Sequence, residues 1–111
     1  MQIITPEVLN ARMSETLVQL VDVRSPAEYA RGHAKGAVNI PLDRLSTATL
    51  ADFDLKAPIY LICKSGTRSH MGVRMLHSYG VMTAVNVTGG TDRWLWAGLP
   101  IEAATAGALI G

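Results

Sequence analysis

The sequence has little cysteine, no run of like charges and no long apolar segment. With Cys63 as its single cysteine, the chain lacks the thiols for a disulfide or for a zinc site built on paired cysteines. Ten basic against nine acidic side chains give a net charge of +1, which does not indicate a nucleic-acid or membrane-surface partner. The longest stretch without Asp, Glu, Lys, Arg or His, Ser78–Thr91, is interrupted by Gly, Asn and Thr. Because a membrane helix needs about 20 mostly apolar residues, we expect no membrane segment.

The first residues also lack the basic start and long apolar stretch of a secretory signal, so a cytoplasmic location is the default expectation. A length of 111 residues fits one compact domain and excludes a two-domain enzyme. The composition, 49% hydrophobic and 17% charged, argues against intrinsic disorder. We expect a domain over residues 1–102 and a flexible, uncharged tail over 103–111.

Strand and helix patterns alternate along the chain. Hydrophobic segments at 17–23, 59–62 and 84–87 predict strands covered on both faces of a parallel sheet, and a shorter strand is predicted at 37–40, ended by Pro41. Helix starts are predicted at Thr5-Pro6-Glu7, extending to about Met13, and at Ser25-Pro26-Ala27-Glu28, where Ser25 and Glu28 form a capping box and Gly32 ends the helix. Residues 42–54 have no strong periodicity and remain unassigned.

Two further helices follow the last two strands. One is predicted to turn Gly72, Met75, Leu76 and Tyr79 toward the core and to end at Gly80. The other follows the Gly89-Gly90 turn, carries Trp94 and Trp96 as packing residues, and ends at Gly98. Repeated strand and helix indicate an α/β sheet with helices on its faces.

Cys63 lies between a buried strand and a helix start, where ligands bind in open α/β sheets. Helix-start amides stabilise anions, so a cysteine there is expected to have a lowered pKa, and Lys64 and Arg68 act in the same direction. Gly66 lets the backbone turn so that amides from Lys64 to Ser69 converge on the sulfur. The alternative is a small buried hydrophobe, the commonest fate of free cysteine, but such a residue needs neither this glycine nor two nearby cations.

The loop Cys63-Lys64-Ser65-Gly66-Thr67-Arg68 resembles the C-x-x-G-x-R loop of single-domain rhodaneses, a sulfurtransferase family. The likeness extends over about residues 3–102. It includes the segments Val21-Asp22-Val23-Arg24 with Glu28-Tyr29, Gly32-His33-Ala34-Lys35-Gly36-Ala37-Val38-Asn39-Ile40-Pro41, and Gly89-Gly90 with Trp94 and Ala97-Gly98-Leu99-Pro100.

The resemblance implies a three-layer α/β fold with a central five-stranded parallel sheet. It also implies that Cys63 takes the outer sulfur of thiosulfate as a persulfide and passes it to a thiol or to cyanide, without a cofactor. Lys64 and Arg68 are expected to draw in the dianionic donor, and Ser65, Thr67 and Ser69 to add hydroxyl hydrogen bonds. Related phosphatases and arsenate reductases hold Cys and Arg one residue further apart, so this loop is expected to favour sulfur over phosphate or arsenate.

Arg68 has a second interpretation, as an ion pair that shapes the loop, with Glu28 or Asp22 as partner. Asp22 and Arg24 are expected to support the loop rather than touch substrate. His70 and His77 lie two turns apart, about 10 Å along a helix, too far to share one ion, and His33 is expected to bind backbone rather than metal. We therefore expect a thiosulfate sulfurtransferase without a metal. The alternative is a persulfide carrier or regulatory module whose partner, and sulfur acceptor, is another protein.

Overall fold

The computed structural model describes residues 2–103, and its centre is a five-stranded parallel sheet. Every neighbouring pair of strands is parallel, so the carboxyl ends of the strands meet at one edge, where open α/β sheets bind their ligands. The fold predicted from the sequence is therefore confirmed. In the sheet order β1-β6-β5-β2-β4, the strands are β1 (Ile3–Ile4), β2 (Gln19–Asp22), β4 (Val38–Asn39), β5 (Ile59–Ile62) and β6 (Ala84–Val87).

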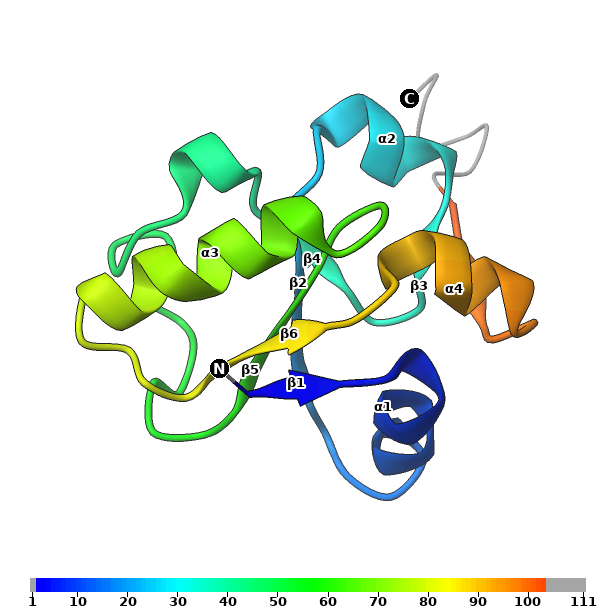
Figure 1. The fold of residues 1–111 in the computed structure, drawn as a ribbon, viewed down its shortest axis with the longest axis horizontal. Helices are drawn as coiled ribbons and strands as arrows, with labels where there is room; N and C mark the ends of the chain where they lie inside the picture. The colour runs from blue at the N-terminus through cyan, green and yellow to red at the C-terminus, as the bar shows by residue number, and fades with distance from the viewer. Residues whose placement is uncertain (1, 104–111) are drawn as a thin grey trace.

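Helices cover both faces of this sheet. Figure 1 shows α3 (Thr67–Ser78) on one side and α1 (Pro6–Met13) and α4 (Gly90–Trp96) on the other. A shorter helix, α2 (Pro26–Arg31), follows β2, and a 3-10 helix, η1 (Leu42–Arg44), follows β4. This is the three-layer arrangement expected of alternating strands and helices.

The core has two parts because side chains alternate across the strands. Leu61 of β5 belongs to a buried cluster with Leu76 of α3 and with Cys63 itself. Ile62, the next residue along the strand, packs instead in a second cluster with Leu9 of α1 and Trp94 of α4. The cysteine that follows β5 is thus anchored at the edge of a packed core.

Local signals at the first two helix starts are confirmed. Thr5 caps α1, with its hydroxyl oxygen accepting the amide hydrogen of Val8 at 3.3 Å. Ser25 and Glu28 form the reciprocal capping box at the start of α2, and Gly32 is its C-cap. These helices begin where a capping side chain satisfies an otherwise unpaired amide.

Some boundaries and orientations predicted from the sequence are wrong. The strand predicted at 17–23 is only Gln19–Asp22, and Leu17 is fully exposed in the connection before it. The strand predicted at 37–40 is reduced to Val38–Asn39. Tyr79 is 50% exposed because α3 ends at Ser78 and Tyr79 is its C-cap. The buried face of α3 consists of Ser69, Gly72, Val73 and Leu76.

Several elements had no sequence prediction. β1 forms one edge of the sheet, and β3 (His33–Ala34) pairs antiparallel with β7 (Ile101–Glu102). The unassigned segment 42–54 contains η1 and turns that bury Leu45 and Leu50. The predicted tail, 103–111, lies outside the described residues except for Ala103.

Candidate active site

The loop between β5 and α3 wraps its backbone around the Cys63 sulfur. The Gly66 amide donates a hydrogen bond to Cys63 Sγ at 3.1 Å, and the Ser69 hydroxyl lies 3.3 Å from the same atom. Gly66 has a φ of 105°, a left-handed conformation that favours glycine. It is also the N-cap of α3 and supplies no side-chain cap, so the start of the helix faces the sulfur.

This environment lowers the pKa of the Cys63 thiol. Burial alone raises it, but hydrogen bonds from the Ser69 hydroxyl and amide, and from the amides of Gly66 and Ser65, outweigh that effect. Cys63 is only 1% exposed. A sulfur this enclosed is reached by small reagents and by narrow terminal atoms rather than by bulky groups.

The start of α4 fixes the loop from outside. Thr91 donates to the Cys63 carbonyl through its amide at 2.8 Å and its hydroxyl at 2.9 Å, and the Asp92 amide donates to the Lys64 carbonyl at 2.9 Å. A Cβ atom at Gly90 would lie 2.5 Å from the Cys63 carbonyl oxygen, so only glycine permits this approach. Because these carbonyls bond outward to α4, the loop amides are left to face the sulfur.

Both cations of the loop are paired with carboxylates. Lys64 Nζ lies 2.9 Å from Asp92, with both side chains largely exposed. Arg68 makes a two-pronged pair with Glu28 at 2.7 and 2.9 Å. Hydrogen bonding to Arg68 lowers the pKa of Glu28 from 4.5 to about 2, although partial burial opposes it, and the same bonds raise the pKa of Arg68.

Of the two partners suggested for Arg68, the structure selects Glu28. Asp22 instead binds Arg24, whose guanidinium lies 2.8 Å from the carboxylate and also donates to the Gly32 carbonyl at 2.7 Å. Asn39 closes this buried group by donating to the carbonyls of Asp22 and Arg24. Within residues 2–103, the hydrogen bonds of the Asp22 and Arg24 side chains join β2 to the end of α2 and none reaches the loop 63–69.

The hydroxyl groups of the loop differ in position. Ser69 is fully buried and touches the sulfur, whereas the Ser65 and Thr67 side chains make no hydrogen bond to other described residues. Ser65 contributes through its backbone amide.

No histidine hydrogen-bonds the Cys63 sulfur among the described residues. His33 Nδ1 is 2.8 Å from the Tyr29 carbonyl oxygen, and its ring stacks on the Tyr29 ring, which confirms the predicted backbone contact. His77 Nε2 is buried without a partner among the described residues. No three His, Cys, Asp or Glu side chains within residues 2–103 gather as a metal-binding group.

The two tryptophans differ in burial. Trp94 is fully buried, and its Nε1 donates to the Pro100 carbonyl at 2.7 Å, as a packing residue should. The prediction for Trp96 is wrong: it is 84% exposed, because α4 turns this side chain away from the sheet.

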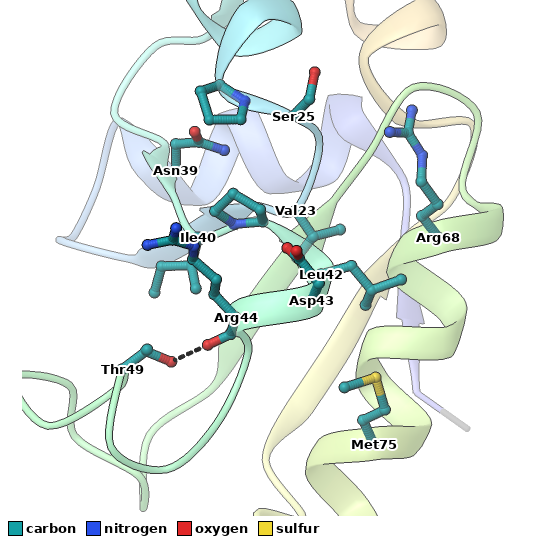
Figure 2. A pocket seen from close by; sticks show the side chains of 12 residues that line it. Val23, Ser25, Asn39, Ile40, Leu42, Asp43, Arg44, Thr49, Arg68 and Met75 are labelled. Atoms are coloured by element: carbon teal, nitrogen blue, oxygen red, sulfur yellow. Dashed lines mark hydrogen bonds between the residues drawn. The ribbon is translucent and has the colours of Figure 1, made fainter.

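An open cavity of about 940 Å³ lies beside Arg68. Figure 2 shows Arg68 and Met75 extending from α3, the Leu42 side chain pointing toward this helix, and Arg44 on the side away from it. The cavity wall is stabilised by the Thr49 hydroxyl, which donates to the Arg44 carbonyl at 2.9 Å. The lining combines apolar side chains with two arginines, and one of these belongs to the active-site loop.

Three residues that hold the cysteine loop were missed from the sequence: Asn86, Thr91 and Asp92. Asn86 lies in β6, the strand beside β5, and the other two lie in α4, which follows it. The signal for them was the parallel sheet itself, because the carboxyl ends of adjacent parallel strands share one edge. The strand order needed to use that signal was not specified by local pattern.

A parallel α/β sheet that presents a cysteine in a cradle of amides defines a class of nucleophilic cysteine domains. The family follows from comparison: a model of the rhodanese-like domain matches residues 5–97. The chain therefore belongs to the rhodanese-like family.

Relatives in this family include sulfurtransferases. A sulfurtransferase of Allochromatium vinosum is 34% identical over 101 residues, covering 90% of this chain and 94% of that protein. The adenylyltransferase and sulfurtransferase uba4 of Ogataea parapolymorpha is 37% identical over 75 residues, covering 68% of this chain and 19% of that protein. The rhodanese-like domain of an Anabaena protein has a TM-score of 0.85 at 25% identity, covering 93% of this chain and 80% of that one.

The chain spans different shares of its curated relatives, 94% of the Allochromatium protein but 54% and 19% of two others. None of the helices within residues 2–103 has the length and hydropathy needed to cross a membrane.

Proposed function

We propose that this protein is a sulfurtransferase that accepts sulfane sulfur on Cys63, with thiosulfate as the simplest donor. The observation that carries the proposal is the buried Cys63 sulfur held by the Gly66 amide and the Ser69 hydroxyl. Such donors stabilise a sulfur anion, so they favour both the attacking thiolate and the persulfide that follows.

In the first step, the Cys63 thiolate attacks the outer sulfur of thiosulfate. A bond forms between the two sulfurs, the bond from the outer sulfur to the sulfonate breaks, and its electron pair leaves with sulfite. The product is a persulfide anion on Cys63, so charge is conserved. Neither bond change needs a proton, which fits a site where no carboxylate or imidazole hydrogen-bonds the sulfur among the described residues.

In the second step, an acceptor takes the outer sulfur and the Cys63 thiolate is released. Cyanide gives thiocyanate, and a thiolate gives a new persulfide. We infer that the cavity beside Arg68, which is lined by this one residue of the loop, holds the body of a larger acceptor. This assignment makes the cysteine a shuttle between two half-reactions.

We assign Arg68 to shaping the loop rather than to binding the donor. Its two bonds to Glu28 tie the start of α3 to α2, and Glu28 is itself fixed by Ser25. An arginine already committed to a carboxylate in two-pronged geometry has less capacity to bind a sulfonate. Asp22 and Arg24 support the loop indirectly, because their ion pair fixes the end of β2, the strand beside β5.

The second candidate function is a persulfide carrier whose donor or acceptor is another protein. The pairing of Lys64 with Asp92 supports it, because the loop entrance then offers little net positive charge to attract a small dianion. The uba4 relative, of which this chain spans 19%, shows a related segment inside a larger sulfur-transfer protein.

Intact mass spectrometry tests the proposal on the whole chain. Wild type should gain one sulfur atom from thiosulfate and lose it to cyanide with release of thiocyanate, whereas Cys63→Ser should gain none. Gain from a small-molecule persulfide but not from thiosulfate would favour the carrier. No gain from either donor, with Cys63 reduced, would refute sulfur transfer through this residue.

A further inference from the structure

Asn86 is a buried polar residue in the apolar strand β6. It is 5% exposed and lies between Val85 and Val87. In the sheet it is paired with Leu61 of β5, two residues before Cys63. A polar side chain at such a position requires partners, and Asn86 finds them in the active-site loop.

The contacts of Asn86 fix the orientation of its amide group. Asn86 Nδ2 faces the Gly66 carbonyl oxygen at 3.4 Å, and a carbonyl can only accept a hydrogen. Asn86 Oδ1 therefore faces the Ser69 oxygen, at 2.6 Å. Because Oδ1 is also only an acceptor, the Ser69 hydroxyl must be the donor in this short bond.

The Ser69 hydroxyl consequently has two acceptors and one hydrogen. Asn86 Oδ1 lies at 2.6 Å and Cys63 Sγ at 3.3 Å, on a side chain that is fully buried. While the hydrogen points to Asn86, the Ser69 oxygen presents a lone pair to the sulfur and suits a thiol, which donates. A thiolate requires the hydrogen to turn to the sulfur, and Asn86 Oδ1 then loses its donor in a buried site.

We propose that Asn86 is a positioning residue that restrains the nucleophile by competing with Cys63 for the Ser69 hydroxyl hydrogen. This rests on the proposed function, in which Cys63 is the sulfur carrier. When the thiolate forms, the thiol proton leaves to water and the Ser69 hydrogen turns to the sulfur. In the persulfide the negative charge moves to the outer sulfur, so the hydrogen is free to return to Asn86.

The charged groups near Cys63 are separate from this competition. Arg68 on α3 is the nearby cation whose charge interacts with Cys63, and it is held by Glu28 of α2. Lys64 of the loop is held by Asp92 of α4, and β6 contributes no charged residue. Substituting Asn86 leaves all four groups in place.

The test measures how the alkylation rate of Cys63 by iodoacetamide depends on pH, since this is the only cysteine in the chain. Asn86→Leu keeps a similar size and removes the acceptor. It should move the midpoint of the profile down by about half to one pH unit, a three- to tenfold faster alkylation below the midpoint. Ser69→Ala should move the midpoint up, and Asn86→Leu should have no further effect in the Ser69→Ala background.

Thr91→Val is the matched control, because Thr91 is also buried and holds the loop, but through the Cys63 carbonyl rather than the sulfur. Its midpoint should equal that of wild type. An equal downward shift in Thr91→Val would assign the effect to a loosened loop and overturn the proposal. An unchanged or raised midpoint in Asn86→Leu would also overturn the proposal. So would an Asn86→Leu shift of the same size in the wild-type and Ser69→Ala backgrounds.

If Asn86→Leu fails to fold, Asn86→Val replaces it, since valine suits a buried strand and also lacks an acceptor, and the same sign is required. Alkylation needs no sulfur donor, so this result is independent of sulfur transfer. Shifts as expected in a protein that takes up no sulfur would refute the proposed function alone.

Discussion

If Cys63 takes sulfur from an anionic donor as proposed, Lys64 and Asp92 are the paired charges of the loop and α4 that should influence its attraction. The sequence predicts that Lys64 draws in a dianionic donor, but the Lys64 ammonium lies 2.9 Å from Asp92. Removal of the Lys64 charge should therefore weaken the attraction of a donor that carries two negative charges, and removal of the Asp92 charge should strengthen it. Both side chains are largely exposed, so each effect is expected to be modest.

Lys64→Ala should lower kcat/KM for thiosulfate, and Asp92→Asn should raise it, each by no more than about fivefold because exposed ion pairs are worth about 1 kcal/mol or less. Methanethiosulfonate, which has one negative charge, should respond less to both changes. Steady-state rates at low and high salt measure this, since salt should shrink both effects. Equal responses to the two donors would contradict a role of charge.

Among the elements, the start of α4 fixes the geometry of the loop, and its two glycines offer a matched pair of substitutions. Both Gly89 and Gly90 have positive φ, so alanine at either costs about 1–2 kcal/mol. At Gly89 the new Cβ would lie 2.8 Å from Arg93 Cβ, within α4 and away from the cysteine, whereas at Gly90 it would meet the backbone carbonyls of Cys63 and Lys64.

Gly90→Ala should therefore lose sulfur loading and be further destabilised, by about 1–3 kcal/mol beyond Gly89→Ala, as expected for overpacking. Gly89→Ala should retain loading at near wild-type rate. Urea unfolding together with intact mass after thiosulfate treatment measures both properties. Full loading in Gly90→Ala would show that the close approach of α4 is not needed for the site.

Local signals predicted the elements well where chemistry within a few residues determines them. The capping box of Ser25 and Glu28 is one such case. The sequence failed where a side chain's surroundings come from elsewhere: Tyr79 matches the helical period but lies one residue past the end of α3. Likewise, Asn86 and Asp92 reach the loop that carries the cysteine only because β6 lies beside β5 in the sheet.

For the molecule as a whole, the two tryptophans are expected to differ in their contribution to stability. Trp96→Phe should leave stability within about 0.5 kcal/mol of wild type, since this side chain is 84% exposed. Trp94→Phe should destabilise, because it removes buried volume and one of the two hydrogen bonds to the Pro100 carbonyl, which keeps only the Lys35 amide as donor. Thermal unfolding followed by circular dichroism measures both, and equal melting temperatures for the two variants would contradict the burial difference.

Acid stability of the whole molecule should depend on the Glu28–Arg68 pair, which joins α2 to α3. The pKa of Glu28 is lowered from 4.5 to about 2 in the folded protein, so its contribution is fully present above pH 4.5 and is lost as pH falls toward 2. Because Arg68 is 38% exposed, solvent screening limits this contribution to on the order of 1 to 2 kcal/mol.

Glu28→Gln isolates this contribution, since glutamine can keep the capping box with Ser25 but cannot titrate. The difference in unfolding free energy between wild type and Glu28→Gln should be largest near neutral pH and should shrink from pH 4.5 downward. Glu7→Gln is the control, because Glu7 pairs with Arg93 in a more exposed position and should show a weaker pH dependence. Urea titrations at several pH values measure both differences, and a Glu28 difference that stays constant with pH would mean that Arg68 does not hold this carboxylate ionised.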